Sequence, residues 1–225
     1  MSVHLVTSSY NAIGVLDLQG GVCEHVEHLQ RLDLPYQRVK QSEDFDHLAG
    51  LIIPGGESTC LGRLLHIFGL KDVILRHHHR GMKIWGTCAG AILLADKIVG
   101  EAPCLSLIDM EIERNSFGSQ LDSFKTEGIM EAVSDQPIPL TFIRAPKIHS
   151  VGNHVNVLLR MDDYIAAAEN AGVLVTVFHP ELTGCLELHR YFSLKCGLVG
   201  AGTTSSAIDP NWNHSSWMKL ARIAS

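Results

Sequence analysis

The sequence predicts an α/β fold, built on a doubly wound, mostly parallel sheet with helices on both faces. Short apolar runs, typical of buried strands, alternate with segments whose apolar residues recur at helical spacing. A helix between successive strands makes those strands parallel. The length of 225 residues and the hydrophobic content of 46% allow one sizeable core, and we expect a single domain.

The first half of the chain alternates strand and helix regularly. Residues 12–19 form a compact apolar run that predicts a strand, and Val22, Val26, Leu29 and Leu32 after it are spaced as on one face of a helix. The pattern continues as strand, short helix, strand and two further helices, at 36–40, 42–48, 50–54, 57–67 and 70–81.

The second half is richer in strands. Five strands and one late helix are predicted, at 105–114, 140–146, 154–161, 163–169, 171–179 and 187–195. From Gly197 the composition turns to Gly, Thr and Ser, which is typical of a loose tail. We therefore divide the chain into an N-terminal extension (1–11), one domain (12–196) and a partly disordered C-terminal tail (197–225).

Composition excludes several classes of protein. A net charge of −6 and a pI near 6.1 argue against nucleic acid as the main partner, because phosphate binding needs a basic surface. No apolar run approaches the roughly 18 to 20 residues of a membrane span, and the first residues lack the pattern of a signal peptide. The six cysteines form no C-x-x-C pair, so neither a zinc site nor a disulfide framework is indicated. We expect a cytoplasmic protein without metal or cofactor.

The run Met82–Ala95 contains the first candidate for chemistry, Cys88. A strand ends in Gly-Thr-Cys-Ala-Gly, and a helix is predicted at 91–99. Glycines two positions before and after Cys88 match the G-x-S-x-G nucleophile elbow with sulfur in place of oxygen. A helix N-terminus also favours a thiolate. A buried cysteine at an ordinary strand-to-helix turn would fit the same pattern.

A nucleophilic thiolate needs a base, and the base needs an orienting group. His179 follows an apolar strand, and Glu181 lies two residues later, where an extended backbone would place both side chains on one face. A histidine before the turn-forming Pro180 is the alternative interpretation. The run 77–79 holds three further histidines at a predicted helix end, where solvated side chains are expected rather than a metal site.

The consecutive glycines Gly55 and Gly56 follow another predicted strand. Their backbone N–H groups can approach a ligand oxygen closely, which suits an oxyanion hole. The P-loop pattern is missing. A glycine turn capped by Ser58 or Thr59 is the alternative.

Six motifs together resemble the glutaminase subunits of pyridoxal 5'-phosphate synthases, a branch of the class I triad glutaminases with a flavodoxin-like fold. In chain order they are GVLDLQG (14–20) with Glu24-His25, PGGEST (54–59), GTCAGA (86–91), RNSFGSQ (114–120), FIRAP (142–146) and FHPEL (178–182). The GTCAG and His-x-Glu motifs are shared by the wider class. The motifs PGGEST, RNSFGSQ and FIRAP indicate the branch.

This resemblance implies roles for individual residues. Cys88 would be the nucleophile, His179 the general base and acid, and Glu181 the group that orients the histidine. The oxyanion hole would come from Gly55, Gly56 and Ala89. Glutamine-binding positions would be Gly56, Glu57, Ser58, Arg114, Ile143 and Arg144.

The resemblance also implies a partner. Ammonia from glutamine would pass to a separate (β/α)₈ synthase subunit within a large hetero-oligomer, because this chain is too short to contain a barrel of about 250 residues. Glutaminase activity would stay low until the synthase docks, and we expect docking near the N-terminal strand and the helix that carries Glu24 and His25. A triad glutaminase for another synthase and a catalytically silent docking subunit remain alternatives.

Overall fold

Five parallel strands form one half of the main sheet in the computed structural model, which describes residues 11–114 and 123–200. In order across the sheet they are β2 (Tyr36–Val39), β1 (Ala12–Leu16), β3 (Leu48–Ile53), β4 (Lys83–Thr87) and β12 (Val173–Thr176). Strands β3 and β12 are buried along their whole length, which requires cover on both faces. The other parts of the chain, including 115–120 of the RNSFGSQ motif, lie outside the described residues.

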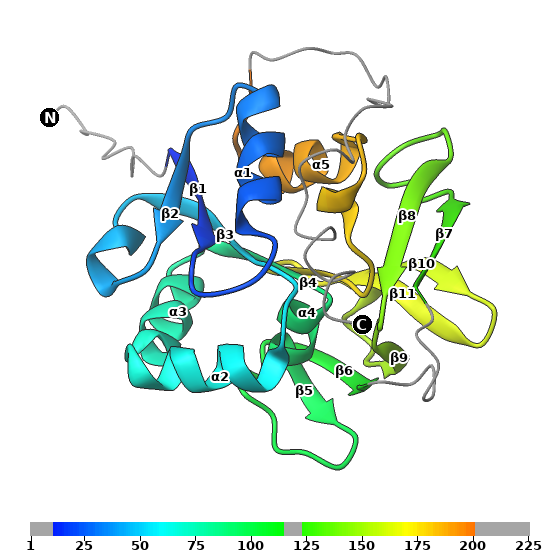
Figure 1. Ribbon diagram of the computed structural model, residues 1–225, viewed down its shortest axis with the longest axis horizontal. Coiled ribbons are helices and arrows are strands. Elements are labelled where there is room, and N and C mark those ends of the chain that lie inside the picture. Colours follow the sequence, from blue (N-terminus) through cyan, green and yellow to red (C-terminus); the bar gives the residue numbers. More distant parts are fainter. Residues whose placement is uncertain (1–10, 115–122, 201–225) are drawn as a thin grey trace, which may run out of the picture.

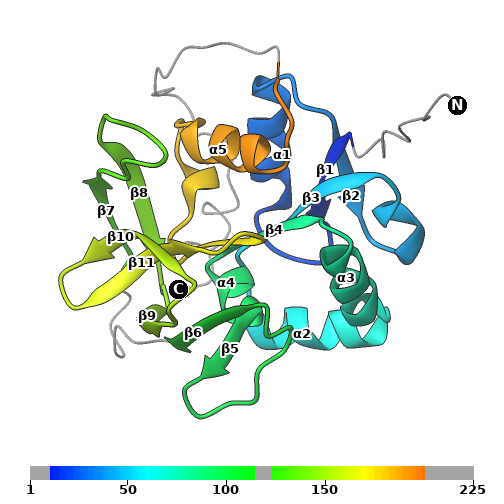
Figure 2. The same cartoon turned by 180° about the vertical axis from the view of Figure 1, so that it is seen from behind.

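Helices cover both faces of this parallel half, as predicted. Helices α1 (Val22–Arg31) and α5 (Glu187–Lys195) lie on one face (Figures 1 and 2). The opposite face carries α2 (Ser58–Ile67), α3 (Leu70–His79) and α4 (Ala89–Leu94). A short 3₁₀ helix, η1 (Ser42–Phe45), stands where a short helix was expected. The predicted α/β architecture is confirmed for this half.

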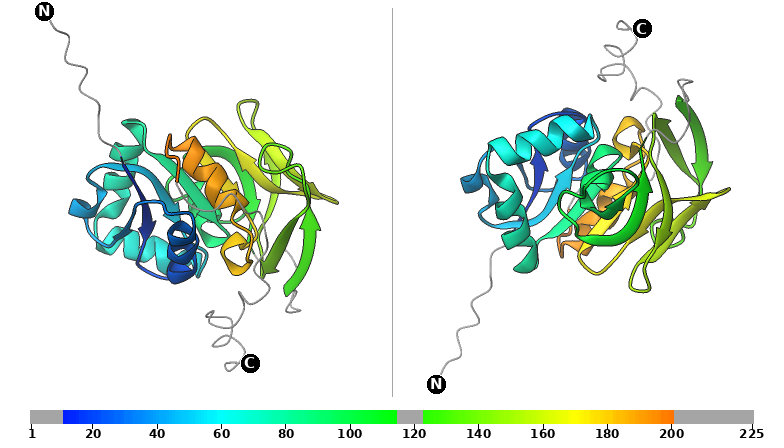
Figure 3. Two further views of the ribbon diagram at one scale, coloured as in Figure 1. Left: turned by 90° about the horizontal axis from the view of Figure 1, so that it is seen from above. Right: turned by 90° about the horizontal axis from the view of Figure 1, so that it is seen from below.

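The second half of the chain forms a mostly antiparallel extension. The main sheet continues from β12 through β11 (Tyr164–Glu169), β9 (Lys147–Val151), β6 (Ile108–Glu113) and β5 (Ala95–Ile98), while β10 (Asn156–Met161) pairs with β11. Strands β7 (Ser123–Gly128) and β8 (Ile138–Ile143) form a separate antiparallel pair. Figure 3 shows these strands gathered on one side of the molecule. Most of them follow one another without helices and pair antiparallel, whereas β5 and β6 pair in parallel.

Two local predictions differ from the structure. The predicted helix 91–99 ends at Leu94, and Ala95–Ile98 continue as β5, paired in parallel with β6. Strands β7 and β9 were not predicted, because both contain few apolar residues and several polar or charged ones.

The carboxyl ends of β3, β4 and β12 meet at one edge of the sheet, because these strands are parallel neighbours. This edge is where open α/β sheets place their ligands. The residues that follow these strands are the Gly55 turn, Cys88 and His179. Separately, none of the helices described is long and apolar enough to cross a membrane.

Candidate active site

Cys88 sits on a sharp turn between β4 and α4. Its backbone has φ 47° and ψ −102°, a conformation that residues with a Cβ rarely adopt. The flanking glycines are required by close packing: a Cβ on Gly86 would lie 2.5 Å from the carbonyl carbon of Gly90, and a Cβ on Gly90 would lie 2.1 Å from the carbonyl oxygen of Ile53. The geometry is that of a strained nucleophile elbow.

His179 and Glu181 lie side by side just after β12. Nδ1 of His179 is 2.8 Å from Oε1 of Glu181, and the two residues are 2% and 0% exposed. An extended backbone was expected between them, but Pro180–Leu182 form a 3₁₀ turn, η2. The backbone N–H of His179 donates to the carbonyl oxygen of Thr141 at 2.8 Å, which fixes the turn against β8.

The His179 ring also contacts Cys88. Burial acts to lower the pKa of His179, but the charge of the Cys88 thiolate, the charge of Glu181 and hydrogen bonds to both hold it well above its ordinary value of 6.5. Because Nδ1 faces Glu181, Nε2 is the nitrogen available to the sulfur. The three side chains can therefore activate a thiol and transfer a proton.

The Gly55 turn packs directly against these groups. A Cβ at Gly55 would lie 2.4 Å from Cε1 of His179 and 3.3 Å from Cβ of Cys88, so only glycine fits without displacement. Its N–H donates to Oγ1 of Thr87 at 2.8 Å. Of the three residues expected to form the oxyanion hole, Gly56 and Ala89 line the cavity in the described structure, whereas the Gly55 N–H faces Thr87.

An open cavity lies in front of Cys88 and His179. All six residues expected to bind glutamine line it: Gly56, Glu57, Ser58, Arg114, Ile143 and Arg144. Glu181 lies behind His179 and has no exposed surface. The structure thus brings together at one site residues from the turns after β3, β4, β6, β8 and β12.

Glu57 and Arg114 form the charged wall of the cavity. Oε1 and Oε2 of Glu57 accept the N–H groups of Thr59 and Cys60, so this carboxylate caps helix α2. Partial burial acts to raise the pKa of Glu57, but these hydrogen bonds and the charge of Arg114 lower it. Nη1 of Arg114 lies 2.9 Å from both carboxylate oxygens of Glu101, a residue that the sequence analysis missed.

Arg144 stands apart from this network. It is exposed, has φ 43°, and makes no ion pair with any residue of the described ranges. Its guanidinium is therefore a cation at the cavity that can meet an anionic group of a ligand.

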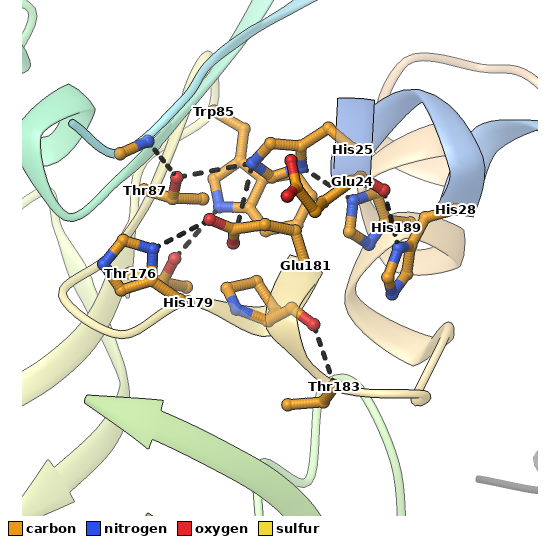
Figure 4. A network of polar contacts seen from close by, with 12 residues as sticks. Glu24, His25, His28, Trp85, Thr87, Thr176, His179, Glu181, Thr183 and His189 are labelled. Atoms are coloured by element: carbon orange, nitrogen blue, oxygen red, sulfur yellow. Dashed lines mark hydrogen bonds and ion pairs between the residues drawn. The ribbon is translucent and has the colours of Figure 1, made fainter. Parts of the chain in front are cut away.

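A cluster of buried histidines lies behind Glu181 and was also missed. His25 and His28 from α1 meet His189 from α5, and all three are 0% exposed (Figure 4). Burial lowers the pKa of His25 to about 4 and that of His28 to about 4. His25 and His28 lie on the apolar face of α1 with Val22 and Leu29, a periodicity that could have revealed their burial. The His25 side chain therefore belongs to the interior.

The second group of histidines, His77 to His79, is only partly solvated. His77 packs against the ring of Phe45, and Nδ1 of His78 lies 3.0 Å from the carbonyl oxygen of Met82, whereas His79 is exposed.

Comparison with known proteins gives concordant matches. The sequence matches the SNO glutamine amidotransferase family over residues 15–197. It is 61% identical over 215 residues to pyridoxal 5'-phosphate synthase subunit PdxT of Syntrophus aciditrophicus (strain SB), covering 95% of this chain and 96% of that protein. It is 50% identical over 182 residues to the protein of that name from Clostridium botulinum (strain Loch Maree / Type A3), covering 80% and 94%. A crystal structure described as a glutamine amidotransferase superposes with a TM-score of 0.78 at 41% identity, covering 83% of this chain and 99% of that one.

Proposed function

This chain belongs to the SNO glutamine amidotransferase family, and from that premise we propose that it hydrolyses L-glutamine to L-glutamate and ammonia for a pyridoxal 5'-phosphate synthase. The observation that carries the proposal is the Cys88 elbow facing a histidine whose other nitrogen is held by a buried carboxylate. This is the arrangement of a nucleophile, a base and an orienting group.

Glutamine would enter the cavity with its side-chain amide toward Cys88. Its α-carboxylate would meet Arg144, the cation that is free of ion pairs within the described residues. Its ammonium group would meet Glu57, which keeps lone pairs for a further donor after capping α2. Arg114 is held between Glu57 and Glu101 and would set the position of the Glu57 carboxylate.

In the first half-reaction, the Cys88 thiolate attacks the side-chain amide carbon and forms a C–S bond. The oxygen becomes an anion, which the N–H groups of Gly56 and Ala89 would stabilise; Ala89 opens α4, so its N–H has no acceptor within the helix. His179 gives its proton to the amide nitrogen. The C–N bond then breaks, ammonia leaves, and a γ-glutamyl thioester remains.

In the second half-reaction, neutral His179 takes a proton from water, and the resulting hydroxide attacks the thioester. The C–S bond breaks, glutamate leaves, and the thiolate–imidazolium pair returns. Glu181 supports the imidazolium in both steps because its carboxylate faces Nδ1 at 2.8 Å. One water is consumed for each ammonia released.

The partner would be the (β/α)₈ subunit of the synthase, and ammonia would pass to it. The described structure offers a reason for a gate: the Gly55 N–H, expected to serve the oxyanion hole, is bonded to Thr87. Docking would rearrange this turn. Loss of one oxyanion donor costs about 10²- to 10³-fold in turnover, enough to keep the free chain slow.

Glutamate release by the wild-type chain and by Cys88→Ala, each with the synthase subunit, tests this function. Release of glutamate by the wild type but not by Cys88→Ala, both with the synthase, supports the proposed function. No release by the wild type with the synthase would favour a silent docking subunit. Activity only with another synthase would favour the other triad glutaminases.

A further inference from the structure

A group of buried polar side chains behind Glu181 joins two parts of the active site. Figure 4 shows the His25 ring between the Glu181 carboxylate and His189, with Thr87 beside it. Each of these four residues is 0% exposed. A buried polar group loses its hydrogen bonds to water, so contacts among these side chains offset part of the cost of burying them.

One nitrogen of His25 faces two acceptors. Its Nε2 lies 3.4 Å from Oγ1 of Thr87 and 3.6 Å from Oε2 of Glu181. Both distances exceed those of a short hydrogen bond, so one N–H is shared electrostatically between the two oxygens. The other carboxylate oxygen, Oε1, faces Nδ1 of His179 at 2.8 Å. Two histidines thus face the two oxygens of one carboxylate, His179 at hydrogen-bond distance and His25 at a longer electrostatic contact.

The contact with His189 assigns the proton of His25. Burial lowers the pKa of His25 to about 4 and that of His189 well below its ordinary value, so both rings are neutral at neutral pH. Nδ1 of His25 lies 2.8 Å from Nε2 of His189, and two neutral rings bond only if one donates and the other accepts.

A proton on Nδ1 of His25 would leave a lone pair on Nε2 facing the Glu181 carboxylate, which is repulsive. The proton therefore belongs on Nε2, and His189 donates from its own Nε2. Nδ1 of His189 is then an acceptor, and it has no hydrogen-bond partner among the described residues. A buried acceptor without a partner is better tolerated than a buried N–H.

Thr87 connects His25 to the Gly55 turn. Its Oγ1 accepts the Gly55 N–H at 2.8 Å, and Thr87 directly precedes Cys88 in the chain. Gly55 in turn packs on the His179 ring. A displacement of His25 would therefore shift Glu181 and, through Thr87, the Gly55 turn.

We propose that His25 is a positioning residue: its Nε2–H holds Oε2 of Glu181 and Oγ1 of Thr87 in one arrangement, and thereby sets His179 and the Gly55 turn together. The inference rests on the proposed glutaminase function. His25 touches neither the cavity nor the reacting atoms, so it acts only through Glu181 and Thr87.

Two variants of His25 separate its donor from its shape. Gln can place an N–H near the position of Nε2, whereas Asn reaches only the position of Nδ1. With the synthase subunit present, we expect His25→Asn to lower kcat about 10- to 100-fold, as small misplacements of catalytic groups do. The KM for glutamine should stay within about 3-fold, because uniform substrate binding is untouched. His25→Gln should keep most of the activity.

His28→Asn is the matched control. His28 lies on the same helix, its Nδ1 faces the carbonyl oxygen of Glu24 at 2.9 Å, and its ring stacks on His189. The variant should lose stability but keep the kcat of the folded protein. A merely structural role for His25 predicts instead that activity follows the folded fraction equally in all three variants, and that result would overturn the proposal.

Alkylation of Cys88 by iodoacetamide, followed on its own peptide by mass spectrometry, tests the inference apart from the function. We expect slower labelling in His25→Asn than in His25→Gln. If the wild type releases no glutamate with the synthase, the proposed function fails, and this labelling order alone decides the inference. If the wild type is active and His25→Asn retains its full kcat, only the inference fails.

Thr87 gives a second approach should the His25 variants not fold. Thr87→Val keeps the shape and removes the hydroxyl that Gly55 and His25 share, whereas Thr87→Ser keeps it. In the isolated chain, where the Gly55 N–H is bonded to Thr87, we expect the Val variant to hydrolyse glutamine faster than the wild type, because the Gly55 N–H is released, and the Ser variant to match the wild type. A wild-type rate for isolated Thr87→Val would overturn the proposed link between Thr87 and the Gly55 turn.

Discussion

Oε1 of Glu181 lies 2.8 Å from Nδ1 of His179 in a position that solvent does not reach. Burial acts to raise the pKa of Glu181, but His25, His179 and hydrogen bonds outweigh it and lower that pKa. The pKa of His179 is raised by the same contact. The pair therefore favours carboxylate and imidazolium, the charges from which the proposed proton transfer by His179 starts.

Replacing Cys88, the proposed nucleophile, should abolish turnover and leave the fold intact. We expect Cys88→Ala to release no glutamate above a few per cent of the wild-type rate, because the thioester cannot form. Coupled assay of glutamate in the presence of the synthase measures this. Cys60→Ala is the control, since Cys60 is exposed on α2.

The strained backbone gives a second readout at this position. Glycine tolerates φ 47° without penalty, so Cys88→Gly should be more stable than Cys88→Ala by about 1 kcal/mol or more in urea unfolding. Equal stability of the two variants would contradict the elbow geometry. Substantial activity in both would point to another nucleophile.

The two partners of the triad should differ in their effect. His179→Asn removes the proton-transfer group and should lower kcat by about 10²- to 10⁴-fold. Glu181→Gln keeps the shape and removes the charge, so it should retain more activity and lower the pKa of His179. Steady-state kinetics and NMR titration of the His179 ring test the two statements. A harmless Glu181→Gln would reduce the triad to a dyad.

The sequence was sufficient for the outline of the fold and for candidate residues that the structure brings together at one site. Alternation of apolar runs identified the parallel strands, and the six motifs in order indicated a family that the matches confirm. The glycines around Cys88 and the spacing of His179 and Glu181 identified the candidates for the proposed triad. These signals are local, so one sequence can reveal them.

The contacts that support the site could not be predicted in this way. His25 and His189 are 164 positions apart and meet only because α1 and α5 share one face of the sheet. Glu101 follows β5 and Arg114 follows β6, and the two meet because these strands pair in parallel. A longer helix was predicted in place of β5, so this contact was not foreseen. From the sequence, the Gly55 N–H was expected to serve the oxyanion hole. Its bond to Thr87 could not be foreseen, because the two residues meet only in the folded chain.

Glycine at position 55 should be indispensable. In Gly55→Ala the new Cβ would lie 2.4 Å from Cε1 of His179, so we expect loss of activity and a stability loss of about 1 to 3 kcal/mol. Gly62→Ala is the matched control: its Cβ would meet only Leu93, at 3.6 Å, within helix α2. The free energy of unfolding of Gly62→Ala should rise by about 0.5 to 1 kcal/mol, and the variant should keep its activity. Wild-type turnover in Gly55→Ala would contradict the close packing.

Stability should fall on the acid side of neutrality. His25 and His28 have folded pKa values of about 4 against an ordinary 6.5, so between these values the unfolded chain binds protons that the folded chain does not. Each should cost up to about 1.4 kcal/mol per pH unit as the pH falls through this window. Urea unfolding at several pH values measures the slope.

The raised pKa of His179 acts with the opposite sign. Its contribution is complete below pH 6.5 and is lost as the pH rises through its folded pKa, so stability should peak near 6.5. His28→Gln should flatten the acid slope by about 1.4 kcal/mol per pH unit. Stability independent of pH between about 4.5 and 6.5 would contradict the neutral, buried histidine cluster.

Glutamate release at saturating glutamine, measured for the isolated chain and after addition of the (β/α)₈ synthase subunit, tests the central claim most directly. Because the Gly55 N–H is bonded to Thr87 at 2.8 Å, the account predicts slow hydrolysis by the isolated chain. It predicts a rise of about 10²-fold or more with the synthase, and no release by Cys88→Ala in either case. Equal wild-type rates with and without the synthase, or no release in both, would contradict it.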